Sequence, residues 1–193
     1  DMEGSRGLGD VYKRQFKRLE GLLEDALKDE NEKSYLLGNV VINGADIDAV
    51  FIRPPSTFFI IEFKQGGGLL EAGENDKWKL NGNPLMSDRR LSNPFVQVRS
   101  YRRKVNQRLK GTSLYDRSKC MVMFSDQIKV PNLGSLKNIW FSLFEITEGS
   151  KFLLKNNFRD VKFDQKFVDQ FLSTLDGRTN PISLEPRLKS VFL

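Results

Sequence analysis

Three closely spaced apolar runs constrain the fold of this chain more than any other feature. Residues 35–42, 47–52 and 58–63 are rich in Val, Ile and Phe, which favour β-strands. Asn43-Gly44 separates the first two runs and Arg53-Pro54-Pro55-Ser56 the last two, and both separators are typical of tight turns. The sequence therefore predicts a three-stranded antiparallel meander.

Helical periodicity flanks these runs. Residues 16–28 carry apolar side chains at three- and four-residue steps, as in an amphipathic helix. Asn93-Pro94 is typical of a helix start, with Asn93 as N-cap of a helix that ends near residue 109. Further elements are expected at residues 119–124 (strand), 138–141 (strand) and 164–175 (amphipathic helix). This alternation predicts an α/β sandwich around a mixed β-sheet.

The absence of histidine limits the chemistry of the chain. None of the 193 residues is His, which excludes Ser-His and Cys-His nucleophilic machinery and the usual kind of zinc site. The single cysteine, Cys120, lies in an apolar run, so we expect inert packing and a reducing compartment. Any catalysis must therefore depend on carboxylates, amines and metal ions.

Charge and hydropathy favour a polyanionic partner and no membrane. The formal charge is +6 and the pI is about 9.4. No stretch approaches the roughly 20 apolar residues that span a bilayer, and no leader pattern opens the sequence, so we expect a cytoplasmic protein. A basic ridge, which could hold nucleic-acid phosphates or equally be a solvated helix face, is predicted from the spacing of Arg99, Arg102, Arg103 and Lys110.

Two terminal segments are expected to lie outside the domain. Residues 1–15 contain glycines without periodicity and end in a run that resembles translated sequencing-adapter read-through, so we expect a non-native or disordered tail. Residues 176–193 have the composition of a linker or of the truncated start of a further domain. One domain over residues 16–175 remains.

Charged residues gather at one end of the expected hairpin. If Arg53 and Thr57 close the turn, Asp48 lies opposite Glu62, and Lys64 points to the same face. Two neighbouring carboxylates repel each other unless a cation or proton intervenes, and oxygen ligands suit Mg²⁺ or Mn²⁺. The pattern predicts a metal site, with Lys64 orienting or activating a water. The alternative is a set of ordinary strand-end charges that Lys64 neutralises.

The order of several short motifs resembles the nuclease-related domain (NERD) family, a branch of the PD-(D/E)xK nuclease superfamily. The motifs are Glu20 and Leu27, then Asp46-Ile47-Asp48, then Ile61-Glu62-Phe63-Lys64 with Gly68 and Trp78 beyond, and finally Asn93-Pro94-Phe95-Val96-Gln97. The resemblance covers about residues 16–175. It implies a restriction-endonuclease-like α/β/α sandwich and a nuclease that uses Mg²⁺ or Mn²⁺ on nucleic acid, more specifically DNA.

The resemblance also assigns roles to single residues. Asp48 and Glu62 are implied as metal ligands and Lys64 as the catalytic lysine. Glu20 is implied as a third carboxylate of the site, although Glu24 lies one turn later on the same helix face and either can equally be a solvated charge.

Gln97 is implied as a polar helix residue that faces the site, and a helix-terminal residue without substrate contact is the alternative. One departure from the commonest family pattern is the run Gln65-Gly66-Gly67-Gly68, which we expect to add flexibility after the lysine.

Three functions follow from these patterns. The first is a metal-dependent nuclease acting on DNA, for which the expected neighbour in a longer parent chain is a helicase-type domain. The second is a non-catalytic nucleic-acid-binding module with a degenerate nuclease fold, and the third is an interaction domain whose charges form a structural network. DNA cleavage with Mg²⁺ or Mn²⁺ that is lost in Lys64→Ala would single out the first.

Overall fold

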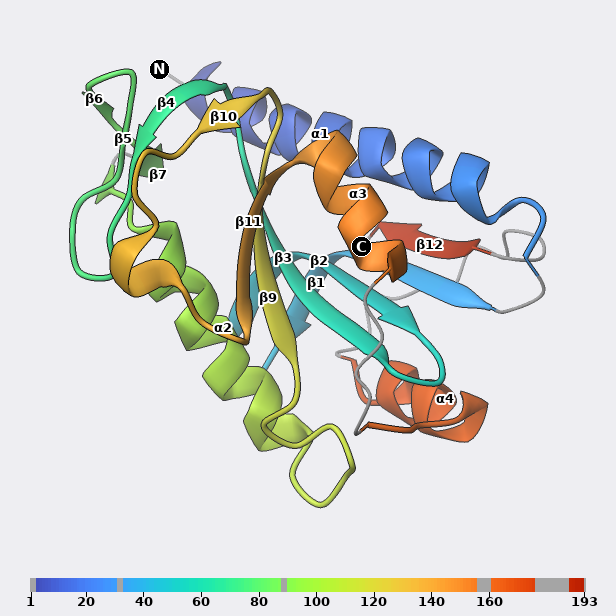
Figure 1. Cartoon of the computed structure of the whole chain (residues 1–193). Coiled ribbons are helices and arrows are strands. Elements are labelled where there is room, and N and C mark those ends of the chain that lie inside the picture. The colour runs from blue at the N-terminus through green and yellow to red at the C-terminus, as the bar shows by residue number, and fades with distance from the viewer. Residues whose placement is uncertain (1–2, 31–32, 88–89, 156–160, 176–187, 193) are drawn as a thin grey trace.

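A mixed six-stranded β-sheet forms the centre of the protein (Figure 1). The computed structural model describes residues 3–30, 33–87, 90–155, 161–175 and 188–192. The strand order is β11-β9-β3-β2-β1-β12. The strands are β1 (Ser34–Ile42), β2 (Ala45–Arg53), β3 (Thr57–Lys64), β9 (Lys119–Phe124), β11 (Phe141–Glu145) and β12 (Leu188–Phe192). The predicted meander is confirmed, because β1, β2 and β3 pair antiparallel, whereas β9, β11 and β12 are added in parallel.

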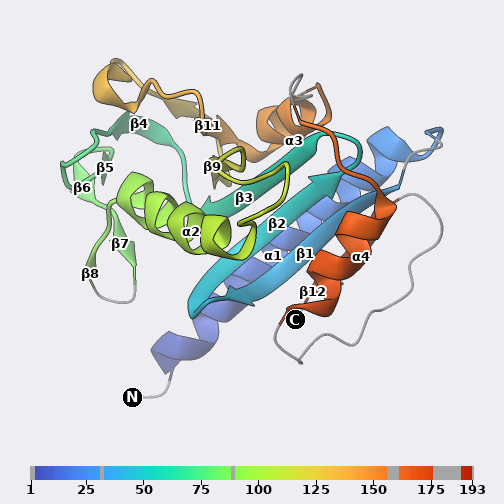
Figure 2. The same ribbon diagram turned by 90° about the horizontal axis from the view of Figure 1, so that it is seen from below.

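Helices cover both faces of this sheet (Figures 1 and 2). They are α1 (Glu3–Leu27), α2 (Pro94–Arg108), α3 (Ile146–Lys155) and α4 (Gln165–Ser173). Phe58 meets Phe171 of α4 edge-on at a ring distance of 5.3 Å, and its neighbour Phe59 meets Phe152 of α3 at 6.1 Å. Since adjacent strand residues point to opposite faces, α3 and α4 lie on opposite sides of the sheet. The predicted α/β/α sandwich is confirmed, with α1 beside α3 and α2 on the side of α4 (Figure 2).

Helix α1 begins much earlier than the sequence pattern indicated. Residues 3–15 were expected to lie in a tail, but they continue the helix that carries Leu19, Leu23 and Leu27 into the core. Each glycine before Gln15 disfavours the helix by about 1 kcal/mol, but no proline lies within residues 3–15 to end it. Gln15 is buried and Tyr12 packs partly buried against the core, so the buried face of α1 extends past the predicted boundary.

The C-terminal boundary also differs from the expected one. Leu188–Phe192 forms β12, which pairs in parallel with β1, so this part of the expected linker belongs to the main sheet. Residues 176–187 lie outside the described residues. None of the helices in the described part of the chain is both long and apolar enough to cross a membrane.

A small second sheet follows the glycine run. Its strands, in the order β10-β4-β5-β6, are β10 (Ile128–Lys129), β4 (Gly68–Glu71), β5 (Lys79–Leu80) and β6 (Asn83–Pro84). A two-stranded ribbon, β7 (Met86–Ser87) and β8 (Arg90–Leu91), and a short 3₁₀ helix at Gly134–Leu136 accompany it. The segment between the glycine run and α2 therefore contains several short strand pairs.

The glycine run is closely packed. A Cβ on Gly67 would lie 2.6 Å from both Asp126 Cβ and Gln127 O. Gly68 has a φ of +117°, and a Cβ there would lie 2.2 Å from Asn81 Oδ1. Gly67 is therefore required by a close approach of the backbone, and Gly68 by its positive φ.

Candidate active site

The predicted hairpin register places the two acidic residues side by side. Arg53 pairs with Thr57 and Ala49 with Ile61, so the next positions are Asp48 and Glu62. Asp48 Oδ2 accepts a hydrogen bond from Phe63 N at 2.8 Å. Asp46, near the start of β2, is exposed and pairs with Val41 of β1. The carboxylates therefore share one end and one face of the hairpin.

Glu62 and Lys64 form a buried ion pair at the end of β3. Glu62 is 1% exposed and Lys64 is 5% exposed. Lys64 Nζ donates to Glu62 Oε1 at 2.6 Å. In the part of the chain that the structure describes, Glu62 Oε2 is buried without a hydrogen-bond partner. An unsatisfied carboxylate oxygen is costly in such a place, so this atom is the position at which a further cation fits.

Asp48 shows the same need for a cation. Burial raises the pKa of its carboxyl well above the usual value, and the charge of Glu62 raises that pKa further. The Phe63 N–H and the Lys64 ammonium lower the pKa but do not offset these effects. Mg²⁺ commonly binds one or two carboxylates and completes its shell with water. Asp48 and Glu62 therefore fit a divalent ion.

Gln97 of α2 reaches the same lysine. Its Oε1 accepts from Lys64 Nζ at 3.3 Å, and its Nε2 donates to Tyr101 Oη at 2.6 Å. Burial and the negative charge of Glu62 raise the pKa of the Tyr101 hydroxyl, which keeps it protonated. The sequence pattern placed Tyr101 on the apolar side of α2, although its four-residue spacing from Gln97 was the available signal.

Comparison with known families bears directly on this cluster. A family model for the nuclease-related domain matches residues 17–125, which is more than half of the chain. The chain belongs to the nuclease-related domain family. No curated protein and no solved structure matches it. The NERD match runs from α1 to the end of β9, so it contains every residue of the cluster formed by Asp48, Glu62, Lys64, Gln97 and Tyr101.

The structure does not join Glu20 to the two carboxylates of the NERD site. Glu20 is buried on α1 and accepts from Lys17 Nζ at 2.6 Å. No three Asp, Glu, Cys or His side chains among the described residues come together as a possible metal site. The reason is that α1 lies in the layer with α3, whereas Glu62 points to the face covered by α2. Glu24, the alternative, is exposed.

Another residue of α1 does contact the site. Gln15 Nε2 donates to the backbone oxygen of Lys64 at 2.9 Å. Gln15 Oε1 is buried and has no hydrogen-bond partner among the described residues. The sequence pattern could not indicate this contact, because Gln15 lies in the segment expected to be a tail.

Two members of the predicted basic ridge have partners within the protein. Arg99 forms a 2.8 Å ion pair with Glu74. Arg102 donates to Ser118 O at 2.8 Å and to Asp116 O at 2.7 Å. Both arginines are thus bound by segments that flank α2, which helix spacing alone does not reveal.

The other two members of the predicted ridge, Arg103 and Lys110, are exposed. They are the ones that remain suited to phosphate contacts.

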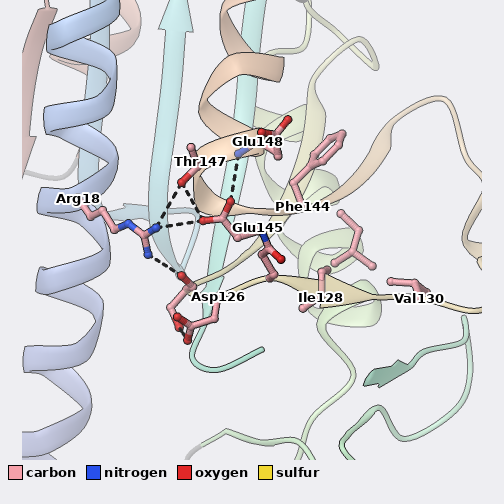
Figure 3. Close-up of a pocket in the computed structure, with 11 residues that line it drawn as sticks. Arg18, Asp126, Ile128, Val130, Phe144, Glu145, Thr147 and Glu148 are labelled. Carbon is pink, nitrogen blue, oxygen red and sulfur yellow. Dashed lines mark hydrogen bonds and ion pairs between the residues drawn. The ribbon is translucent and has the colours of Figure 1, made fainter. Parts of the chain in front are cut away.

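A separate pocket of about 570 Å³ lies where β9 and β11 end (Figure 3). Arg18 of α1 spans it, donating to Ser125 O at 2.5 Å, Glu145 Oε1 at 3.1 Å and Thr147 Oγ1 at 3.3 Å. Its remaining lining residues are Asp126, Gln127, Ile128, Val130, Leu143, Phe144 and Glu148. The pocket adjoins the NERD site through Ser125, whose N–H donates to Lys64 O at 3.0 Å, but it contains none of the charged site residues.

Proposed function

We propose that this nuclease-related domain is a metal-dependent phosphodiesterase that cleaves DNA. The observation that carries the proposal is the pair of half-buried Asp48 and buried Glu62, in which Glu62 Oε2 has no hydrogen-bond partner among the described residues and the Asp48 pKa is raised. Buried like charges at one point destabilise the fold unless they are compensated. Their occurrence in a chain of a nuclease-related family therefore supports a site for Mg²⁺ or Mn²⁺.

The side chains divide the work between them. Asp48 and Glu62 hold the metal, which when bound supplies a Lewis acid and a water that ionises more easily. Lys64 lies between Glu62 Oε1 and Gln97 Oε1, so its ammonium offsets the charge that builds up on the phosphate. Gln97 steadies this amine without adding a charge. Glu20 has no part in the proposed ligand set, because it is not grouped with Asp48 and Glu62.

The substrate proposal depends on charge. The chain carries +6, and the exposed side chains of Arg103 and Lys110 supply sequence-independent phosphate contacts. DNA is proposed over RNA from the superfamily to which this fold and family point. A helicase-type neighbour in a longer parent chain and a cytoplasmic location complete the proposal.

Metal-dependent cleavage tests the proposal most directly. Purified protein should cut plasmid or single-stranded DNA with Mg²⁺ or Mn²⁺ and lose that activity in EDTA. Asp48→Asn keeps an oxygen for the Phe63 N–H but removes one negative charge, so it should abolish cleavage and Mn²⁺ binding while leaving the metal-free protein at least as stable.

Lys151→Ala is a control charge change at an exposed position of α3, where Lys151 pairs with Glu148 on the surface, and it should leave cleavage unchanged. Calorimetry with Mn²⁺ alone reads the site independently of activity. Full cleavage by Asp48→Asn would refute the assignment of Asp48.

The second candidate is a nucleic-acid-binding module without catalysis. The exposed Arg103 and Lys110 favour it as much as they favour an enzyme. Salt-sensitive DNA binding with no cleavage under Mg²⁺, Mn²⁺ or Ca²⁺ would support this candidate in place of the first.

A further inference from the structure

The side-chain amide of Gln97 has different partners at its two ends. Lys64 Nζ has only protons to donate, so it must meet the amide oxygen, at 3.3 Å. The amide nitrogen then faces Tyr101 Oη, at 2.6 Å. The lysine end therefore sets which way the amide faces, because a tyrosine hydroxyl can accept as well as donate.

The tyrosine end holds the amide more tightly than the lysine end. A 2.6 Å contact is a short hydrogen bond, whereas one of 3.3 Å lies beyond the usual range for N–H to O bonds. Tyr101 is half-buried and is one turn after Gln97 on α2, so both side chains lie on one helix face. The hydroxyl of Tyr101 is thus the contact that anchors the amide at the end away from Lys64.

We propose that Tyr101 is a positioning residue for Lys64, which it serves by fixing the Gln97 amide with its oxygen toward the lysine amine. This inference rests on the proposed function, since the position of Lys64 matters most if Lys64 meets a phosphate. Without the hydroxyl, the amide keeps only its long 3.3 Å contact with the ammonium and can swing away from it. Lys64 then keeps its contact with Glu62 but loses the second one that holds the amine in place.

Tyr101→Phe removes the hydroxyl and keeps the ring, so it is the sharpest variant. We expect kcat for metal-dependent DNA cleavage to fall about tenfold with little change in KM, which corresponds to one lost hydrogen bond. Tyr115→Phe is the matched control, because Tyr115 is 51% exposed and lies outside the cluster, and its rate should equal that of the wild type.

A double variant separates positioning from a direct or merely structural role. In a Gln97→Ala background, Tyr101→Phe should change kcat less than twofold, because the group that it orients is gone. A loss in that background as large as in the wild type would overturn the proposal, as would an unchanged kcat in Tyr101→Phe alone.

A measurement without activity keeps this inference distinct from the proposed function. The Nε2 protons of Gln97, assigned by their absence in Gln97→Ala, should exchange slowly with solvent and should exchange faster in Tyr101→Phe but not in Tyr115→Phe. If the wild type cuts no DNA, the proposed function fails and this exchange result alone decides the orienting contact. Equal exchange in Tyr101→Phe and the wild type would refute that contact.

Discussion

Asn93 connects the start of α2 to the loop that precedes β5, and its substitution tests how the helix bearing Gln97 is fixed. Asn93 Oδ1 accepts from Val96 N at 3.1 Å, which caps the helix. Asn93 Nδ2 lies 3.3 Å from Gly73 O, 3.0 Å from Glu74 O and 2.8 Å from Asp76 O. One side chain therefore satisfies a helix N–H and gathers three backbone carbonyls of the loop.

The expected cost follows from these two sets of contacts. Loss of an N-cap costs about 1 kcal/mol, and leaving the part-buried Glu74 carbonyl without this donor costs about 1–3 kcal/mol more, whereas Gly73 O keeps the Trp78 Nε1 donor. Asn93→Ala should therefore lower the free energy of unfolding by about 2–4 kcal/mol. Asn93→Ser keeps a capping oxygen but loses the amide donor, so it should recover about 1 kcal/mol of that loss.

Urea unfolding monitored by the fluorescence of Trp78 and Trp140 measures both variants. Asn75→Ala is the control, because Asn75 is exposed in the same loop and its loss should change stability by less than about 0.5 kcal/mol. The reasoning fails if Asn93→Ala costs no more than a cap alone, or if the serine variant is as unstable as the alanine variant.

Two further predictions concern backbone packing and the basic surface. Gly68→Ala should lower the free energy of unfolding by at least about 2 kcal/mol, since φ is +117° and a Cβ would meet Asn81. Gly21→Ala, in open space on α1, should raise the free energy of unfolding by about 0.5–1 kcal/mol. Thermal unfolding distinguishes the two variants, and equal effects would contradict the packing. Arg103→Ala should weaken DNA binding and reduce its salt dependence at unchanged stability, whereas Arg102→Ala should lower the unfolding temperature because that side chain bonds Ser118 O and Asp116 O. Titrations at several salt concentrations and melting curves check this pair, and a melting temperature of Arg102→Ala equal to that of the wild type would count against it.

Local patterns predicted the hairpin and the start of α2 correctly. The period-two alternation and the turn before Thr57 determine the partner of every residue in β2 and β3, so the neighbourhood of Asp48 and Glu62 followed from the sequence. Asn93 and Pro94 likewise mark the first turn of α2 through chemistry that acts within four residues.

Long-range packing explains what the patterns missed. Helix α3 contains Gly149, which weakens a helix in isolation, yet a Cβ there would lie 2.9 Å from Met123 Cε on the sheet. The glycine is therefore required by a contact with a strand far away in the sequence. The strand predicted at residues 138–141 begins at Phe141 instead, because no local pattern marks its start.

The site residues divide in the same way. The partners of Arg99 and Arg102 come from loops 25 and 14 residues away, so helix spacing could not reveal that these two arginines have partners within the protein. The polar contact of Tyr101 with Gln97 was within local reach but was hidden by the apolar stripe around it.

The chain passes twice from the large sheet into the small one, and this arrangement affects Lys64. β4 follows β3 in the chain, and β10 follows β9. Because β3 pairs in parallel with β9 and β4 pairs in parallel with β10, the two chain segments pass side by side from the large sheet to the small one. Two backbone hydrogen bonds join the two segments at this transition. Gly68 N donates to Gln127 O at 2.8 Å, and Asp126 N donates to Gly66 O at 3.2 Å. Lys64 is the last residue of β3 before this transition. A force applied to the small sheet, for example by a bound nucleic-acid strand, would therefore reach the backbone of Lys64 before that of any other residue in the charged cluster.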